Sequence, residues 1–276
     1  MRYTVRLSYD GADFSGWQIQ PNAKSIQECL QAALSTLLGG TVSVTGAGRT
    51  DANVNAVNYL AHFDTAQEPL RDARTLCYKL NAILPPSIVV HEVLPAPSED
   101  FNARFNATGR EYKYFIHRHK DPFALKWSYW FDYDFLDVDA MNRAATCLLG
   151  THDFACFQKK GTDTKTSICT VSRAIWTPYT PAHVREAGFT PDDGKLLRTI
   201  CEGAQDDPAY LVFRICADRF LRNMVRAVVG TLLEIGRGKH GPDWMQEVML
   251  SASRSAAGES VPGHALFFCG ASYPKG

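Results

Sequence analysis

The stretch Gly46–Ala52, which reads GAGRTDA, says most about how this chain folds and acts. It follows a short valine-rich segment that is expected to be a strand, and it places a guanidinium and a carboxylate two residues apart, at Arg49 and Asp51. Glycine permits backbone conformations closed to other residues and lets a ligand approach closely. The sequence therefore predicts a loop, shaped by Gly46 and Gly48, that presents Arg49 and Asp51.

Two purely structural interpretations of this stretch stay open on spacing alone. Arg49 and Asp51 are close enough in sequence for a local ion pair. Asp51 also belongs to the residue types that cap helices. Other segments of the chain are needed to separate these interpretations from a functional one.

Further motifs follow in order on both sides of the loop. They are Tyr9-Asp10-Gly11, Gly16-Trp17-Gln18, Phe101–Ala107 (FNARFNA), Arg110–Tyr114 (REYKY), Asp153-Phe154, and Phe220–Arg226 (FLRNMVR) with Val229-Gly230. Together with GAGRTDA, the set resembles the signatures of the TruA family of tRNA pseudouridine synthases, from residue 9 to the C-terminal strand. The resemblance implies an α+β protein with the pseudouridine synthase fold: two antiparallel-sheet α+β halves with a central catalytic cleft.

The resemblance also implies roles for individual side chains. Asp51 is the catalytic nucleophile or base, and Arg226 is its partner, since an opposite charge favours the ionised carboxylate. Tyr112 packs on the target base, whereas Tyr114, which alternates with it along a strand, is assigned to the core. Extruding a base from a stem costs a few kcal/mol. From its position next to Asp51, we hypothesise that Arg49 offsets part of that cost by filling the vacated space or by holding a phosphate.

The sequence departs from the family pattern just after the loop. Where the family continues Asp-Ala-Gly-Val-His-Ala, this chain has Asp51-Ala52-Asn53-Val54-Asn55-Ala56. Asparagine tolerates left-handed backbone angles, so Asn53 is expected to keep the turn that a glycine makes. Asn55 can replace some hydrogen bonds of a histidine, but not its stacking or titration. A catalytically inactive RNA-binding protein on the same scaffold is therefore an alternative, although the intact catalytic set argues against it.

The resemblance implies that uridines at positions 38–40 of the tRNA anticodon stem-loop are the substrate, and that the protein is a homodimer. A pseudouridine synthase for another RNA is a second alternative. The net charge is zero, but Lys and Arg cluster in residues 102–126 and 214–239 while acids gather elsewhere. Local clusters of this kind bind phosphates, so the sequence indicates a basic face. Within the second cluster, Arg219 and Arg222 are expected to bind phosphate or to be structural.

Length and hydrophobic content limit the possible domain organisation and location of the protein. A chain of 276 residues with 45% hydrophobic content can form two cores. We expect an N-terminal α+β domain (1–105) that carries the catalytic Asp51 loop. We expect a C-terminal α+β domain (106–276) that carries the base-stacking Tyr112 and the helix with Arg226. No apolar run approaches the ~18 residues of a membrane span, and the N-terminus does not read as a signal peptide. The expected location is the cytoplasm, with no membrane partner.

Cysteine and histidine patterns predict no cofactor. The eight cysteines show no Cys-x-x-Cys pair and no zinc-type spacing with histidine. Buried reduced thiols are the better interpretation. Neither a metal nor a small-molecule cofactor is expected.

Periodicity predicts the order of the elements. Strands are expected at 3–9, 54–63, from 88, and near 112–116, 169–176, 210–216 and 266–268; helices at 26–38, 70–83, 138–149, 219–235 and 244–249. Residues 178–208, rich in Pro, Gly and Asp, are interpreted as an excursion or a hairpin extension. On the long helix, Arg219, Arg222 and Arg226 would line one stripe.

Overall fold

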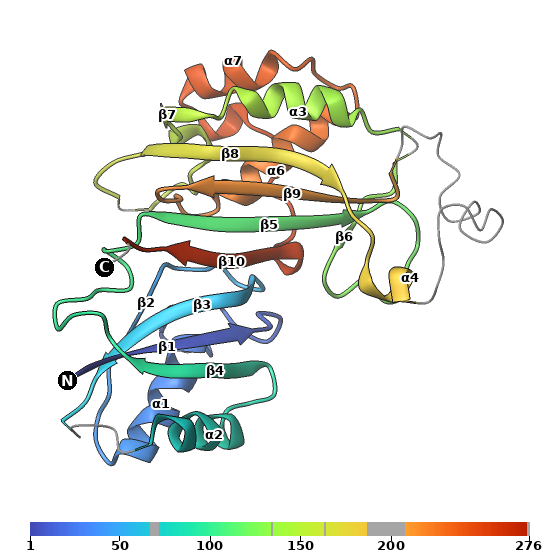
Figure 1. Ribbon diagram of the computed structural model, residues 1–276. Helices are drawn as coiled ribbons and strands as arrows, with labels where there is room; N and C mark the ends of the chain where they lie inside the picture. Colours follow the sequence, from blue (N-terminus) through green and yellow to red (C-terminus); the bar gives the residue numbers. More distant parts are fainter. Residues whose placement is uncertain (67–71, 134, 163, 187–207, 275–276) are drawn as a thin grey trace. The chain divides into compact units, whose positions relative to one another are not determined.

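The computed structural model describes residues 1–66, 72–133, 135–162, 164–186 and 208–274. By its contacts the chain divides into two compact units, Met1–Glu111 with Phe267–Gly276, and Tyr112–Leu266. Each unit combines helices with a mostly antiparallel sheet (Figure 1). This mixed α+β architecture is the predicted fold class. The division by contacts differs from the single boundary expected near residue 105, because the C-terminal strand belongs with the first unit.

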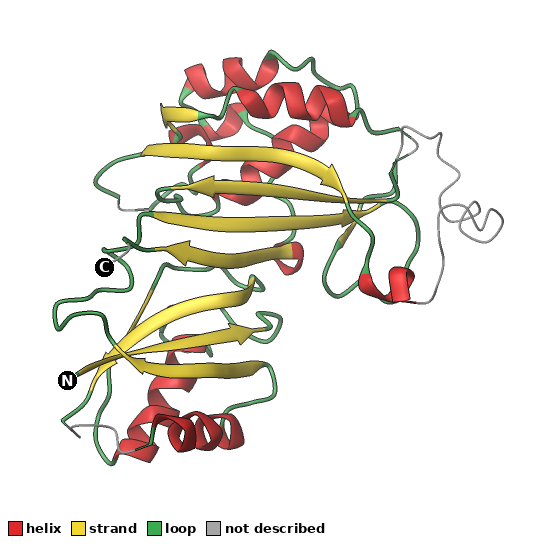
Figure 2. Ribbon diagram, viewed as in Figure 1, coloured by secondary structure: helices red, strands yellow, loops and turns green. Residues whose placement is uncertain are grey.

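The sheet of the first unit has the strand order β4-β1-β3-β10, with β2 against β3. Its strands are β1 (Arg2–Tyr9), β2 (Val44–Gly46), β3 (Asn55–Asp64), β4 (Ile88–Pro95) and β10 (Leu266–Ser272), and its helices are α1 (Ile26–Leu38) and α2 (Ala73–Ile83). All pairs are antiparallel except β10 with β3. Both helices lie on one face of this sheet (Figure 2). The predicted start of α1 is confirmed, because the Ser25 side chain accepts a hydrogen bond from the Glu28 N–H at 3.2 Å.

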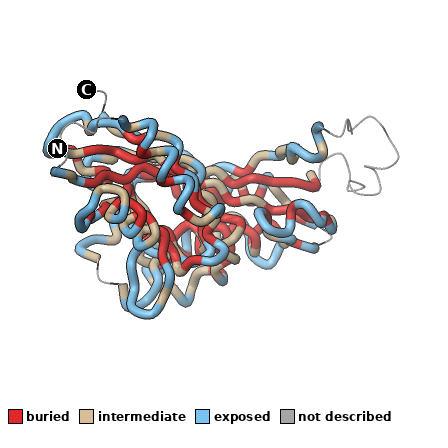
Figure 3. The backbone as a smooth tube through the Cα atoms, turned by 90° about the horizontal axis from the view of Figure 1, so that it is seen from below, coloured by how far each residue is buried: buried red, intermediate tan, exposed pale blue. Residues whose placement is uncertain are grey.

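The sheet of the second unit has the order β5-β9-β8-β7, with β6 beside β5. The strands are β5 (Gly109–His117), β6 (Tyr129–Trp130), β7 (Gly150–Asp153), β8 (Ile168–Pro178) and β9 (Tyr210–Ala217). The helices are α3 (Val138–Thr146), α4 (Ala182–Glu186), α6 (Met224–Gly236) and α7 (Trp244–Ser251), with 3₁₀ turns at Ala155–Phe157, Arg254–Ala256 and Gly263–Ala265. Buried residues run along the strands and the packed helices (Figure 3). Within α6, every residue is buried except Arg226 and Glu234, so this helix forms part of the core of the second unit.

The prediction of a helix from about residue 219 was wrong at its start. Helix α6 begins at Met224, and Asn223 before it has a left-handed backbone with φ 67°. Because a residue in that conformation interrupts the helix, Arg219 and Arg222 lie in the segment that precedes α6 and do not share a helical stripe with Arg226. Of the expected excursion at 178–208, residues 187–207 lie outside the described residues; α4 precedes them.

Seven of the eight cysteines fall in the described part of the chain, and all seven are free thiols. Only Cys156 and Cys169 are fully buried; the other five are half-buried. Burial raises the pKa of Cys156 to about 12 and that of Cys169 to about 11. These two thiols therefore pack as small apolar side chains. Among the helices of the described residues, none has both the length and the apolar character that a membrane span requires.

Candidate active site

Asp51 lies in the first unit, on the connection between β2 and β3 that we call the Asp51 loop (residues 47–54). The loop is built from turns, with the Val54 N–H donating to the Asp51 carbonyl at 3.2 Å. It contains no helix, so the interpretation of Asp51 as a helix cap is wrong. Asp51 is half-buried, whereas Arg49 is exposed.

A buried aromatic pair supports the start of this loop. A Cβ added to Gly46 would lie 2.1 Å from the Tyr59 hydroxyl oxygen and 2.6 Å from the Trp17 ring. The Tyr59 hydroxyl donates to the Gly48 carbonyl and accepts from the Gly48 N–H at 3.3 Å. Neither Gly46 nor Gly48 has a left-handed backbone. The expectation that special backbone angles explain these glycines was therefore wrong: Gly46 is required for close packing.

The N-terminal motifs hold the residue next to Asp51. The Thr50 hydroxyl and the Tyr9 hydroxyl share a hydrogen bond of 2.9 Å, and the Thr50 carbonyl accepts from the Trp17 N–H at 3.2 Å. Gly16 has φ +92°, and a Cβ there would lie 2.3 Å from that same carbonyl oxygen. The motifs at residues 9–11 and 16–18 therefore fix the peptide groups that carry the carboxylate.

The two asparagines that depart from the family pattern both have structural roles. Asn53 has φ 63°, which confirms the expected left-handed turn, and its N–H donates to the Phe14 carbonyl at 3.3 Å. Asn55 is buried, and its side-chain oxygen accepts from the Gly11 N–H at 2.9 Å. Both departures therefore keep the loop tied to the N-terminal motif.

The REYKY motif contacts the Asp51 loop through Arg110. Its guanidinium donates to the Ala47 carbonyl at 3.1 Å, to the Ala107 carbonyl at 3.1 Å and to the Arg104 carbonyl at 2.5 Å. Arg110 thus joins the Asp51 loop to the FNARFNA segment. From the sequence it was only one charge of a basic cluster; its place in the REYKY motif was the available signal.

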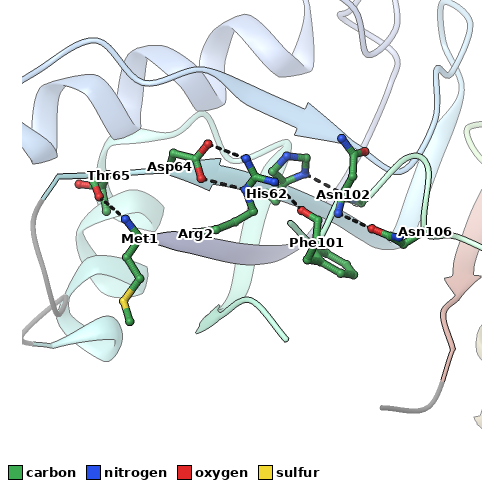
Figure 4. Close-up of polar contacts among 9 residues, drawn as sticks. Met1, Arg2, His62, Asp64, Thr65, Phe101, Asn102 and Asn106 are labelled. Carbon is green, nitrogen blue, oxygen red and sulfur yellow. Dashed lines mark hydrogen bonds and ion pairs between the residues drawn. The ribbon is translucent and has the colours of Figure 1, made fainter. Parts of the chain in front are cut away.

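The FNARFNA segment is itself fastened to β1 and β3 (Figure 4). Arg2, paired with Asp64 at 2.8 Å, donates to the Phe101 carbonyl at 2.9 Å. The Ala103 N–H donates to the ring Nδ1 of His62 at 3.1 Å. Burial, and to a lesser degree the positive charge of Arg2, lowers the pKa of His62. The neutral imidazole can therefore act as the acceptor.

Tyr112 and Tyr114 lie on β5 in the second unit. Tyr112 packs edge-on against Phe220 with ring centroids 5.1 Å apart. Tyr114 is fully buried, and its hydroxyl donates to the Pro262 carbonyl at 3.0 Å. The assignment of Tyr114 to the core is confirmed.

Arg226 lies in the first turn of α6, and its side chain is held by the chain near Pro262. Its Nε–H donates to the Val261 carbonyl at 2.6 Å, while its own carbonyl accepts from the Val261 N–H at 3.2 Å. Burial raises the pKa of Tyr114, the phenol of Tyr129 adds to that effect, and the nearby charge of Arg226 opposes it. Arg226 is therefore a half-buried cation next to a tyrosine of the core.

Each unit thus carries two of the four predicted site residues. Arg49 and Asp51 share one loop of the first unit, while Tyr112 and Arg226 belong to the second. The meeting of the two pairs in one cleft stays a prediction.

Comparisons with known proteins show which family of proteins this chain resembles in sequence. A family model described as tRNA pseudouridine synthase matches residues 144–274. The chain is similar to tRNA pseudouridine synthase A of Bacteroides thetaiotaomicron, with 46% identity over 274 residues that cover 99% of this chain and 91% of the relative. The corresponding protein of Bacteroides fragilis is 44% identical, with 99% and 97% covered. That of Halalkalibacterium halodurans is 38% identical over 268 residues, with 96% and 90% covered.

Proposed function

The chain belongs to the tRNA pseudouridine synthase A family, the TruA family, and from this we propose that it isomerises uridine to pseudouridine at positions 38–40 of the tRNA anticodon stem-loop. It is a tRNA pseudouridine synthase, and hence an isomerase. The reaction breaks the N-glycosidic bond, turns the base and rejoins it to the ribose through carbon. Substrate and product contain the same atoms. To break and remake the bond, the enzyme must supply a positioned carboxylate and a place for the extruded base.

The observation that carries the proposal is the framing of Asp51. Its neighbour Thr50 is fixed through both side chain and carbonyl, and Gly48 is fixed by the Tyr59 hydroxyl. A carboxylate on such a preorganised loop can act on the sugar or base without rearranging. We assign Asp51 as the nucleophile or base and Arg226 as its cationic partner.

Two further assignments concern the RNA. Tyr112 supplies the surface on which the target base packs, and its ring is already oriented by Phe220. Arg49, exposed on the Asp51 loop, fills the gap left by the extruded base or holds a phosphate next to it. tRNA is the macromolecular partner, the proposed assembly is a homodimer, and the cytoplasm is the proposed location.

The test is product formation by the Asp51→Asn variant. Purified protein is incubated with an unmodified tRNA transcript, and pseudouridine is mapped at each position. The wild type should convert uridines 38–40, whereas Asp51→Asn should lose at least about 10³-fold in rate while tRNA binding stays nearly unchanged. The matched control is Asp13→Asn, which removes an exposed carboxylate of the same unit and should leave turnover intact.

The outcomes separate the alternatives. Binding without product from the wild type would indicate an inactive RNA-binding protein. Product only with another RNA would indicate a different substrate. Product from Asp51→Asn would refute the role of Asp51.

A further inference from the structure

The second unit contains a pocket lined by none of the four proposed site residues. It has a volume of about 350 Å³ and is lined by Ala155 and residues 158–162, which follow β7, and by residues 252–254, which follow α7. Its cations are Lys159, Lys160 and Arg254, which lie outside both basic clusters noted in the sequence (102–126 and 214–239).

The described residues that line the pocket carry positive charge. Lys159, Lys160 and Arg254 line it, and no acidic side chain does so within the described residues. Neither lysine forms an ion pair with an acid in the part of the chain that the structure describes. The lining also holds no aromatic ring on which a base could stack. Its chemistry therefore suits a phosphate group better than a nucleobase.

The lysines are carried on a turn that is fastened at several points. The Lys159 N–H donates to the Arg222 carbonyl at 3.0 Å, and the Thr162 hydroxyl donates to the Lys159 carbonyl at 2.7 Å. The Gln158 side chain donates to the Thr162 carbonyl at 3.3 Å and to the Thr164 hydroxyl at 2.9 Å. The backbone of residues 158–162 is thus positioned before any ligand arrives, which lowers the entropic cost of binding.

Arg254 forms the other wall and is also fixed. Its guanidinium donates to the Gly258 carbonyl at 3.0 Å, to the Ala257 carbonyl at 3.3 Å and to the Ser260 hydroxyl at 2.9 Å. Ser260 in turn accepts from the Asn223 side chain at 2.5 Å. These bonds leave the Nε–H of Arg254 without a partner among the described residues, so the cation keeps a donor for a ligand.

Contacts within the second unit connect this pocket to Tyr112. Tyr112 packs on Phe220, two residues before Arg222, whose carbonyl holds the Lys159 turn. Tyr112 and the Lys159 turn therefore contact the same short segment, at Phe220 and at Arg222. An RNA strand whose base packs on Tyr112 would have its neighbouring phosphates within reach of that segment.

We propose that the pocket bounded by Lys159, Lys160 and Arg254 binds a phosphodiester group of the RNA backbone, next to the nucleotide that packs on Tyr112. The proposal rests on the proposed function and adds to it a second anchoring point for the RNA. Phosphate contacts of this kind fix the register of a nucleic acid without reading its sequence.

The test measures how salt weakens tRNA binding. Dissociation constants for an unmodified tRNA transcript are determined from 50 to 300 mM KCl for the wild type and for the double variant Lys159→Ala/Lys160→Ala. Each lost phosphate contact lowers the slope of log K against log salt by about 0.7 to 0.9, so loss of this one contact should lower the slope by roughly 0.8. Affinity at about 150 mM salt should fall roughly tenfold. Lys159→Arg/Lys160→Arg, which keeps both charges, should retain the wild-type slope.

The matched control removes two other cations. Arg74→Ala/Lys79→Ala takes two exposed positive charges from α2 in the first unit and should leave the slope within about 0.3 of the wild type. Equal slopes for the lysine variant and the wild type, or equal losses in both alanine variants, would overturn the proposal. Thermal stabilisation of the wild type by inorganic phosphate, absent in the lysine variant and without any change in the tRNA slope, would also overturn it, since the pocket would then hold a free anion.

Failure of the proposed function gives a different result. The same salt series in the Asp51→Asn background should show the same loss of slope, because the phosphate site does not depend on catalysis. A wild type that binds tRNA with the predicted salt dependence but forms no pseudouridine would refute the activity and leave the phosphate site standing.

Discussion

The two units position their key charged groups in different ways. In the first unit the Asp51 loop is held at residues next to the carboxylate: Tyr9 bonds the Thr50 hydroxyl, Trp17 the Thr50 carbonyl and Tyr59 the Gly48 backbone. In the second unit Arg226 is held through its side chain, by the bond from its Nε–H to the Val261 carbonyl. The carboxylate is therefore placed by a frame of other residues, whereas the guanidinium fixes its own direction.

This difference decides which substitutions should matter. Where the frame does the positioning, the sensitive residues are the small and aromatic ones that build it. Where the side chain positions itself, the sensitive residue is the functional one, and a replacement with the same charge but different geometry should fail. The predictions below separate these two modes.

Of the substitutions that separate these two modes, Arg226→Lys should have the largest effect. Lysine keeps the charge but lacks the planar fork that can donate to the Val261 carbonyl and still offer a second N–H to a carboxylate. We expect kcat to fall on the order of 10²-fold, measured as single-turnover pseudouridine formation at saturating tRNA. Glu234→Gln, at the other partly exposed position of α6, should leave kcat within about twofold. Wild-type turnover from Arg226→Lys would show that charge alone suffices.

Gly46→Ala should destabilise the first unit, whereas Gly48→Ala should not. A Cβ at position 46 would overlap the buried Tyr59 and Trp17, but at position 48 no atom lies within 4 Å. Overpacking of this kind costs about 1–3 kcal/mol, while the change at Gly48 should stay within about 1 kcal/mol. Urea unfolding of both variants measures the difference in the free energy of unfolding. Equal losses would mean that the glycines serve backbone conformation and not packing.

Much of the fold could be predicted from sequence because the signals are local. The capping box at Ser25 fixes the start of α1, and alternation along β1 and β5 marks their buried faces. The start of α6 was missed because apolar periodicity continues through residues 220–223. Asn223, whose side chain allows a left-handed backbone, interrupts the helix there.

The supports of the candidate site were not predictable in the same way. Arg110 reaches a carbonyl 63 residues away, and His62 accepts from an N–H 41 residues away. Such contacts depend on how the strands pair, which periodicity does not specify. The phosphate pocket has the same origin, because Lys159 and Arg254 are neighbours only after folding. The proposed site residues themselves were identifiable only through the motifs that carry them.

The smallest predicted effect tests the frame of the first unit through pH. His62 is 5% exposed and accepts from the Ala103 N–H, and burial lowers its pKa below the ordinary 6.5. Below pH 6.5 the unfolded chain binds a proton that the folded chain resists, so the free energy of unfolding should fall by at most about 1.4 kcal/mol per pH unit. Above pH 6.5 this contribution is complete.

His62→Asn keeps an acceptor that does not titrate. Urea unfolding between pH 8 and 5.5 should therefore show a shallower loss of the free energy of unfolding. His91→Asn, at an exposed position on β4, should keep the wild-type slope. If His62→Asn also keeps it, the imidazole is not the group that couples the FNARFNA segment to pH.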